Sequence, residues 1–207
     1  LNNKKEVRAK DLFKRFLKTV VETGMPYVFF RDTVNRVNPN KHAGNVYSTQ
    51  LCTEICQNTS ATKFIEEKFE DGKIVIRYEP GDTVVCNLAS INVARVNDTK
   101  TIEEIVPLVT RLLDNVITLN YYPIEEAKRT AMRYRSIGLG YLGLAEFLAT
   151  QKLTYDSEEA REKTKKLFAK YACSTYRASV DLAKERGSYS LFKGSEYDKG
   201  FILGKDV

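Results

Sequence analysis

The sequence predicts an α/β fold in which strands are interspersed through the first half and helices dominate the second. Apolar residues recur at helical spacing in long stretches, and short β-branched runs bounded by turn residues lie within residues 74–93. The chain has 207 residues, 43% of them hydrophobic, which suits one domain, or part of one, with a sizeable core. Because no repeat or linker interrupts it, we expect residues 1–207 to form a single unit without an internal domain boundary.

The first 55 residues are predicted to contain a helix, a short strand and a long loop. Residues 6–23 carry an apolar stripe at helical spacing, and Gly24 follows as a helix stop. Residues 27–30 are predicted to form a short buried strand. Residues 33–48 hold four asparagines, a proline and a glycine, which predicts an irregular loop that leads into residues 50–55.

The middle of the chain is predicted to contain strands. Residues 74–78 are apolar or β-branched and lie between two turn sequences, so they are expected to be a strand. Residues 84–93 are predicted to form another strand, which carries Cys86. For residues 63–69 a short helix and a short strand remain equally compatible with the pattern.

Helices are predicted from about Thr101 onward. Thr101 and Glu104 fit a capping box at the start of the first one, although Pro107 favours a kink or a later start. Pro123 is placed at the first position of the next helix, and another is expected over residues 140–150. A long helix is predicted to begin after a Ser157 cap and to end at Gly187.

The net charge of +6 is concentrated at the start of the chain, where residues 1–18 hold seven lysines and arginines against two acidic residues. No zinc-finger or aromatic-rich RNA-binding signature accompanies this charge, so we expect a solvated helix face and no direct nucleic-acid binding. No apolar run reaches the ~18–20 residues that span a membrane, and no apolar signal region begins the sequence. These observations predict a cytoplasmic protein.

The cysteines do not form a metal-binding or disulfide pattern. The four cysteines are Cys52, Cys56, Cys86 and Cys173, without a Cys-x-x-Cys pair, and His42 is the only histidine. We therefore expect no metal site and no disulfide scaffold. Cys56 and Cys173 are expected to be thiols of the hydrophobic core.

Residues 50–55 and 85–91 carry side chains suited to radical chemistry. Cys52 and Glu54 are two residues apart, which on an extended segment sends both side chains to the same face. A thiol can supply a thiyl radical, and a neighbouring carboxylate can accept a proton. Cys86 can supply electrons by becoming half of a disulfide. Hydrogen abstraction, proton removal and reduction are the operations needed to remove a hydroxyl group from ribose.

These two segments resemble the large (catalytic, alpha) subunit of class I ribonucleotide reductase. The resemblance continues in the family's order over nearly the whole chain, in residues 120–124, 133–140, 182–187, 192–195 and 199–200. A lone Cys-x-Glu pair would carry no weight, whereas the ordered series is specific. The resemblance implies that residues 1–207 are an incomplete part of the C-terminal catalytic barrel domain. That domain is a ten-stranded α/β barrel with its active-site loop at the centre.

The resemblance also implies an oxidoreductase that converts ribonucleoside diphosphates to deoxyribonucleoside diphosphates for DNA precursor synthesis. Cys52 would carry the thiyl radical that removes the 3′ hydrogen of the ribose, and Glu54 would accept the 3′-hydroxyl proton. Cys86 would be one of two reducing thiols, with its partner upstream of this chain. Gln50 would hold the substrate hydroxyls, although the family usually has asparagine at this position.

Further parts of the enzyme are expected to lie outside this chain. The resemblance implies that the chain binds no cofactor directly and that a small subunit carries a metal-based radical generator. Nucleotide effectors would bind regions of the large subunit absent here, and a thioredoxin- or glutaredoxin-like protein would supply electrons. We therefore expect a fragment that is inactive alone and associates with the remaining segments of the large subunit.

Two alternatives remain. The motifs could be retained for packing in a non-catalytic assembly or interaction module. Gly138, Gly140 and Gly143 also fit the dinucleotide-binding fingerprint of nicotinamide- or flavin-dependent oxidoreductases. That fingerprint needs a preceding strand and an acidic residue about 20 positions later, whereas residues 133–136 make a poor strand and Asp156 comes early. We expect these glycines to allow close packing of a helix.

Overall fold

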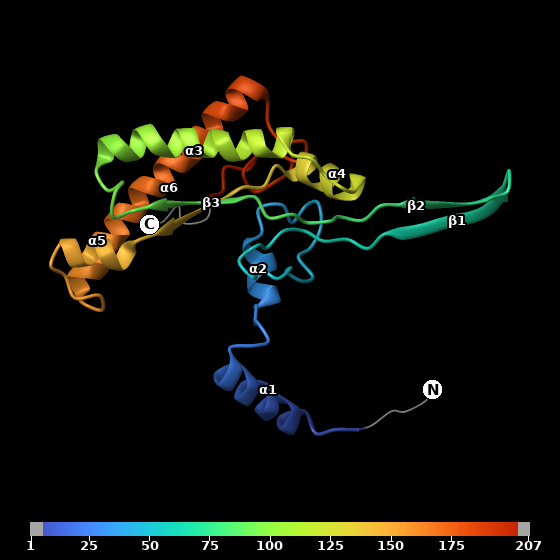
Figure 1. Ribbon diagram of the computed structural model, residues 1–207, viewed down its shortest axis with the longest axis horizontal. Helices are drawn as coiled ribbons and strands as arrows, with labels where there is room; N and C mark the ends of the chain where they lie inside the picture. Colours follow the sequence, from blue (N-terminus) through green and yellow to red (C-terminus); the bar gives the residue numbers. More distant parts are fainter. Residues whose placement is uncertain (1–5, 203–207) are drawn as a thin grey trace.

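The computed structural model describes residues 6–202 and contains both helices and strands, as the sequence predicts (Figure 1). The helices are α1 (Ala9–Thr23), α2 (Arg31–Val37), α3 (Thr99–Leu119), α4 (Glu125–Tyr134), α5 (Leu144–Thr150) and α6 (Glu158–Arg186). The strands are β1 (Lys63–Glu70), β2 (Lys73–Glu79), β3 (Leu88–Asn92) and β4 (Gly138–Leu142). Within this described part, no helix combines the length and the apolar character that crossing a membrane requires.

The core is built around a parallel strand pair and two long helices. Strands β3 and β4 pair in parallel, from Leu88 opposite Gly138 to Asn92 opposite Leu142, and α3 and α4 make the connection between them. This is a βαβ unit, the repeating element of α/β barrels. Helix α6 packs along α3, and buried side chains of β3, α3, α5 and α6 form one hydrophobic cluster. The members of that cluster are Ile91, Val93, Ile102, Val106, Phe147, Leu148, Ala160, Leu167 and Tyr171.

The glycine-rich segment forms a strand, so the prediction of one helix over residues 140–150 is wrong in its first part. Gly138 and Gly140 lie inside β4, and α5 begins only after Gly143. A Cβ atom on Gly138 would lie 2.3 Å from Cδ2 of Leu88 in the neighbouring strand. These glycines therefore allow close strand pairing rather than the helix packing that we expected. In the dinucleotide-binding fingerprint the glycines form a turn between strand and helix, and here two of them lie within the strand itself.

Residues 63–79 form an antiparallel hairpin that projects from the rest of the chain (Figure 1). Asp71 and Gly72 both have positive φ, 51° and 74°, as a two-residue hairpin turn requires. The structure thus resolves residues 63–69 as a strand and confirms the strand over residues 74–78. One face of the hairpin is exposed and mostly apolar: Phe64, Phe69, Ile74, Ile76 and Tyr78 lie on it, together with Glu67, which is opposite Ile76.

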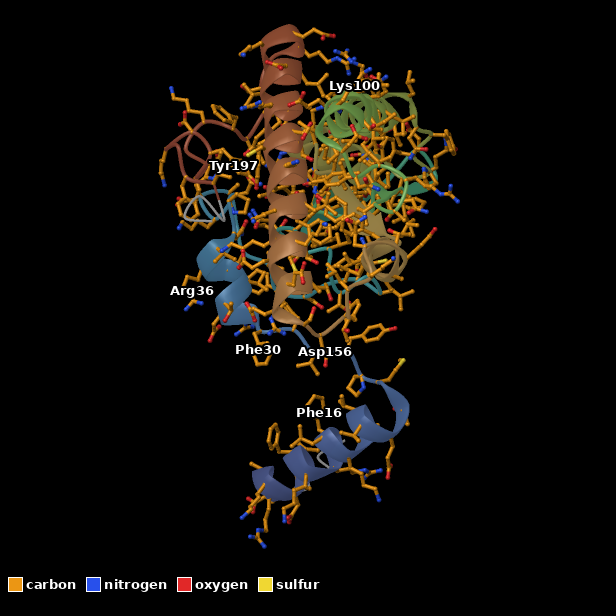
Figure 2. All side chains as sticks on the ribbon, turned by 90° about the vertical axis from the view of Figure 1, so that its left-hand side faces the viewer. Phe16, Phe30, Arg36, Lys100, Asp156 and Tyr197 are labelled. Atoms are coloured by element: carbon orange, nitrogen blue, oxygen red, sulfur yellow. The ribbon has the colours of Figure 1, made fainter. Side chains whose placement is uncertain are left out.

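The N-terminal helix is confirmed, although it begins at Ala9 rather than at residue 6, whereas the prediction of a short buried strand over residues 27–30 is wrong. Helix α1 ends at Gly24, which has a left-handed φ of 72°. Residues 27–30 are extended without a strand partner, and the predicted irregular loop begins with the two helical turns of α2. A short apolar run cannot be assigned to a sheet from the sequence alone, because a strand exists only when another strand pairs with it. Figure 2 shows α1, with Phe16, lying apart from the other elements.

The structure shifts the predicted starts of α3 and α4 and confirms both ends of α6. Helix α3 starts at Thr99, and the Asp98 side chain accepts a hydrogen bond from the Thr101 amide, so the predicted Thr101 capping box is wrong. Pro107 lies within this helix, and α4 begins two residues after Pro123 rather than at it. Helix α6 runs from the Ser157 cap to Gly187, as predicted.

Candidate active site

The predicted site residues lie on two segments that the fold brings together, residues 50–57 and residues 82–87. Cys52 is half-buried in a turn, where the Ile55 amide donates to the Cys52 carbonyl at 3.0 Å. Ile55 is buried and anchors the turn, whereas Glu54 is exposed. The expectation that an extended backbone would align Cys52 and Glu54 is therefore wrong, because residues 51–54 form a turn.

Cys86 lies in the extended segment that leads into β3 and not in the strand itself. The strand begins at Leu88, so the predicted strand over residues 84–93 is too long at its start. Asn87 holds the segment in place: its side chain donates to the Leu113 carbonyl at 2.8 Å, and its carbonyl accepts from the Gly138 amide at 2.9 Å. Cys86 is thus positioned immediately before the parallel strand pair.

Two glutamines connect the Cys52 turn to the Cys86 segment. The Gln50 side-chain amide donates to the Val84 carbonyl at 3.0 Å, and the Cys86 thiol donates to Oε1 of Gln50 at 3.1 Å. The Gln57 side chain donates to the Val85 carbonyl at 3.4 Å. Gln50, Cys52 and Cys86, which were singled out from the sequence, are therefore neighbours in space.

The surroundings of Cys86 favour its protonated form. Burial raises the pKa of the Cys86 thiol to about 11, and the neighbouring Cys52 thiol and the Glu54 carboxylate contribute in the same direction. Cys56 is exposed as a residue, but partial desolvation of its thiol, followed by the charge of Glu54, also raises its pKa. Near neutral pH, Cys86 therefore carries an S–H group that can donate a hydrogen bond or a hydrogen atom.

Asparagine side chains hold the loop that precedes the Cys52 turn. The Asn38 side chain donates to Oδ1 of Asn58 at 2.7 Å, and both residues are buried. The Asn58 amide in turn donates to the Asn40 carbonyl at 2.8 Å and to the Tyr134 hydroxyl at 3.3 Å. The Asn35 side chain bonds both the amide and the carbonyl of Val46. The four asparagines that suggested an irregular loop include the residues that order it, because their amides satisfy backbone groups that no sheet pairs.

Helix α4 holds the segment that precedes Cys86. Asp82 accepts from Arg133 at 3.3 Å and from the Ser60 hydroxyl at 3.0 Å. The Thr83 amide donates to the Thr130 hydroxyl at 2.9 Å. The sequence analysis did not identify these supporting residues. The spacing of Thr130 and Arg133 places both on one helix face, a signal that could have indicated contact with one neighbouring segment.

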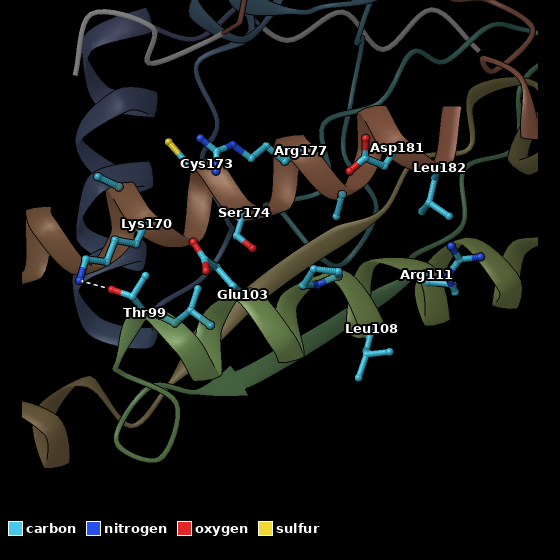
Figure 3. Close-up of a pocket in the computed structure, with 14 residues that line it drawn as sticks. Thr99, Glu103, Leu108, Arg111, Lys170, Cys173, Ser174, Arg177, Asp181 and Leu182 are labelled. Atoms are coloured by element: carbon cyan, nitrogen blue, oxygen red, sulfur yellow. Dashed lines mark hydrogen bonds between the residues drawn. The ribbon is translucent and has the colours of Figure 1, made fainter. Parts of the chain in front are cut away.

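The other two cysteines are not core residues, contrary to expectation. Cys56 and Cys173 are both exposed, although Cys56 keeps a weak contact of 3.5 Å with the Thr53 carbonyl. Cys173 lines a pocket between α3 and α6, together with Pro107 and Arg177 (Figure 3). None of Gln50, Cys52, Glu54 and Cys86 lines this pocket. Among residues 6–202, no group of three or more histidine, cysteine or acidic side chains is arranged to hold a metal ion.

Comparison with known proteins gives a consistent assignment. Residues 1–205 match the family model of the ribonucleotide reductase barrel domain. The chain is 42% identical to the ribonucleoside-diphosphate reductase subunit alpha of Treponema pallidum, over 98% of this chain and 25% of that protein. It is 38% identical to the subunit of the same name from Helicobacter pylori, over 96% of this chain and 30% of that protein.

A solved structure agrees with these relatives. The class Id ribonucleotide reductase alpha subunit of Actinobacillus ureae superimposes with a TM-score of 0.71 at 28% sequence identity, covering 89% of this chain and 34% of that one. The chain spans about a quarter to a third of the length of these relatives. The predicted barrel architecture is confirmed at the level of the family, with β3, β4 and their connecting helices as the part visible here. The chain belongs to the ribonucleotide reductase family and corresponds to its barrel domain.

Proposed function

We propose that this chain supplies part of the active site of an enzyme that reduces ribonucleoside diphosphates to deoxyribonucleoside diphosphates by thiyl-radical chemistry. The observation that carries the proposal is that Gln50 and Cys52 lie beside Cys86, although 36 and 34 residues separate them from it in the sequence. The relatives are named ribonucleoside-diphosphate reductases, which supports a ribonucleoside diphosphate as the substrate. Since the chain covers a minor part of those relatives, the remaining segments of the large subunit complete the site.

Each residue has a distinct chemical role in this proposal. A Cys52 thiyl radical takes the 3′ hydrogen atom of the ribose, and Glu54 accepts the 3′-hydroxyl proton. The 2′-hydroxyl then takes up a proton from one of the two reducing thiols and leaves as water. Cys86 and a second cysteine outside this chain provide two electrons and become a disulfide, while Cys52 returns the hydrogen atom to the 3′ carbon. The protonated state that burial imposes on Cys86 suits this step, because a reducing thiol must deliver hydrogen as well as electrons.

Partners are needed for a complete turnover. A small subunit with a metal-based radical generator would form the Cys52 radical, and a thioredoxin- or glutaredoxin-like protein would reduce the disulfide. The chain itself is proposed to hold no cofactor, and nucleotide effectors are proposed to bind elsewhere on the large subunit. Gln50 is the residue of this chain proposed to contact a ribose hydroxyl, through the amide that now bonds Val84 and Cys86.

Replacement of the radical-bearing thiol tests the proposal. In the complete assembly, with both subunits and a reductant, Cys52→Ser should abolish deoxynucleotide formation, because a serine hydroxyl does not form the radical under these conditions. Cys56→Ser is the matched control: it changes an exposed thiol four residues away and should leave turnover nearly unchanged. Turnover retained by a folded Cys52→Ser assembly would refute the proposed role.

A further inference from the structure

The nitrogen and the oxygen of the Gln50 side-chain amide both form hydrogen bonds with the segment that carries Cys86. Its Nε2 group donates to the Val84 carbonyl at 3.0 Å, and its Oε1 atom accepts from the Cys86 thiol at 3.1 Å. The first contact fixes the orientation of the amide, since the nitrogen must face a carbonyl and the oxygen then faces the thiol. Gln50 therefore presents an acceptor, and not a donor, to Cys86.

We infer that Gln50 is a positioning residue for Cys86: its amide oxygen holds the thiol of Cys86 in the protonated form and beside Cys52. This inference rests on the proposed function, and it assigns to Gln50 a task within this chain that precedes any contact with substrate. The Gln50 side chain is long enough for its amide to span the two chain segments. Through these hydrogen bonds, the position of the Cys86 thiol depends on the conformation of the segment that carries Cys52.

The chemical consequence follows from the direction of the hydrogen bond. A neutral acceptor that receives the S–H proton stabilises the thiol, whereas it repels a thiolate at the same place. The Cys52 thiol and the Glu54 carboxylate also oppose ionisation of the Cys86 thiol. Gln50 differs from Cys52 and Glu54 because it acts on the Cys86 thiol through one hydrogen-bond acceptor, its Oε1 atom.

Gln57 offers a matched control. Like Gln50 it lies on the Cys52 segment and donates to the backbone next to Cys86, at the Val85 carbonyl. The described contacts of Gln57 do not include the Cys86 thiol. A variant of Gln57 therefore removes a bridge between the two segments while leaving the acceptor for the thiol in place.

The experiment measures the rate of Cys86 alkylation by iodoacetamide as a function of pH. It uses the complete subunit, and mass spectrometry follows the tryptic peptide of residues 78–95, which contains Cys86 as its only cysteine. Gln50→Met, which keeps the length but removes the acceptor, should lower the apparent pKa of Cys86 by about 1. Gln50→Glu, which places a carboxylate at the acceptor position, should raise it. Gln57→Met should leave it unchanged.

Opposite shifts in Gln50→Met and Gln50→Glu, with no shift in Gln57→Met, would establish the role. Equal shifts in Gln50→Met and Gln57→Met would overturn it, because the effect would then come from a general loosening of the two segments. The absence of a shift in both Gln50 variants would overturn it as well. The readout needs no turnover, so this inference can fail while the radical role of Cys52 stands, and the reverse is also possible.

Discussion

At the scale of single residues, the site is defined by what surrounds the thiols. Cys86 is half-buried, has a thiol pKa raised to about 11, and donates a hydrogen bond to Gln50. Cys56, only four residues from Cys52, is exposed. Two thiols close in sequence therefore have different environments, and it is Cys52 that faces the Cys86 segment.

Removal of the Glu54 charge should have two measurable effects. In Glu54→Gln the pKa of both Cys56 and Cys86 should fall, because the carboxylate that opposes thiolate formation is gone. Thiol alkylation between neutral and alkaline pH should therefore accelerate at both cysteines. In the complete enzyme, turnover should decrease roughly 10²- to 10⁴-fold, as expected for loss of a general base.

Glu67→Gln, on the exposed hairpin strand β1, provides the control for Glu54→Gln. It removes the same charge from the chain, and neither cysteine pKa is influenced by Glu67. An unchanged alkylation profile in Glu54→Gln would show that the two thiols do not sense this carboxylate. Full turnover in Glu54→Gln would instead contradict its role as the base.

At the scale of elements, the packing of the β3–β4 strand pair against α5 depends on a glycine, which has no side chain. Gly143 joins β4 to α5 with a φ of +79°, and a Cβ atom there would lie 2.3 Å from Oδ1 of Asn92. Asn92 is the last residue of β3, and its Oδ1 atom also accepts from the Ala94 amide at 3.0 Å. The end of the parallel strand pair is therefore packed against the start of α5.

Gly143→Ala should destabilise the fold by more than the strain of a left-handed alanine alone. That strain costs about 1–2 kcal/mol, and the clash with Asn92 adds about 1–3 kcal/mol for overpacking. Gly24→Ala is the matched control, because Gly24 has a φ of +72° and nothing within 4 Å of the added Cβ. Urea unfolding followed by circular dichroism should give a larger loss of unfolding free energy for Gly143→Ala than for Gly24→Ala. Equal losses would mean that Asn92 moves away freely.

At the scale of the whole molecule, the chain exposes more surface than a compact protein of its mass. Its accessible surface is 15054 Å², against the ~9,800 Å² expected for a folded monomer of 23.6 kDa. Helix α1 lies apart from the other elements, and the β1–β2 hairpin projects as an arm (Figures 1 and 2). Large apolar side chains are exposed on both, among them Phe13 at 59% and Phe69 at 76%. Because so much apolar surface is exposed, we expect further segments of the large subunit to pack against α1 and the hairpin.

The isolated chain should therefore self-associate and bind a hydrophobic dye. Light scattering over a range of concentrations should detect species larger than the monomer, and dye fluorescence should exceed that of the complete subunit. Phe69→Ser should reduce both signals, because Phe69 lies on the exposed apolar face of the hairpin. Lys68→Ser, on the opposite face of the same strand, should change neither. A monomeric chain without dye binding would contradict this expectation.

The sequence by itself determined the features that depend on neighbours a few residues away. The end of α1 at Gly24, the Asp71–Gly72 hairpin turn, and the Ser157 and Gly187 limits of α6 each follow from backbone conformations or caps that a short segment specifies. The ordered motifs around Cys52 and Cys86 also identify the family without reference to the fold. Such information is local, or is carried by the order of segments along the chain.

Only the tertiary structure decided which segments meet. The bond between Gln50 and Cys86 joins residues 36 positions apart, and the Asn58 contact with Tyr134 joins residues 76 positions apart. Residues 27–30 are of types common in strands, but no partner strand pairs with them. Cys56 is of a residue type that is usually buried, but it lies at the surface. Pairing and burial are properties of two segments at once, so the composition of one segment cannot specify them.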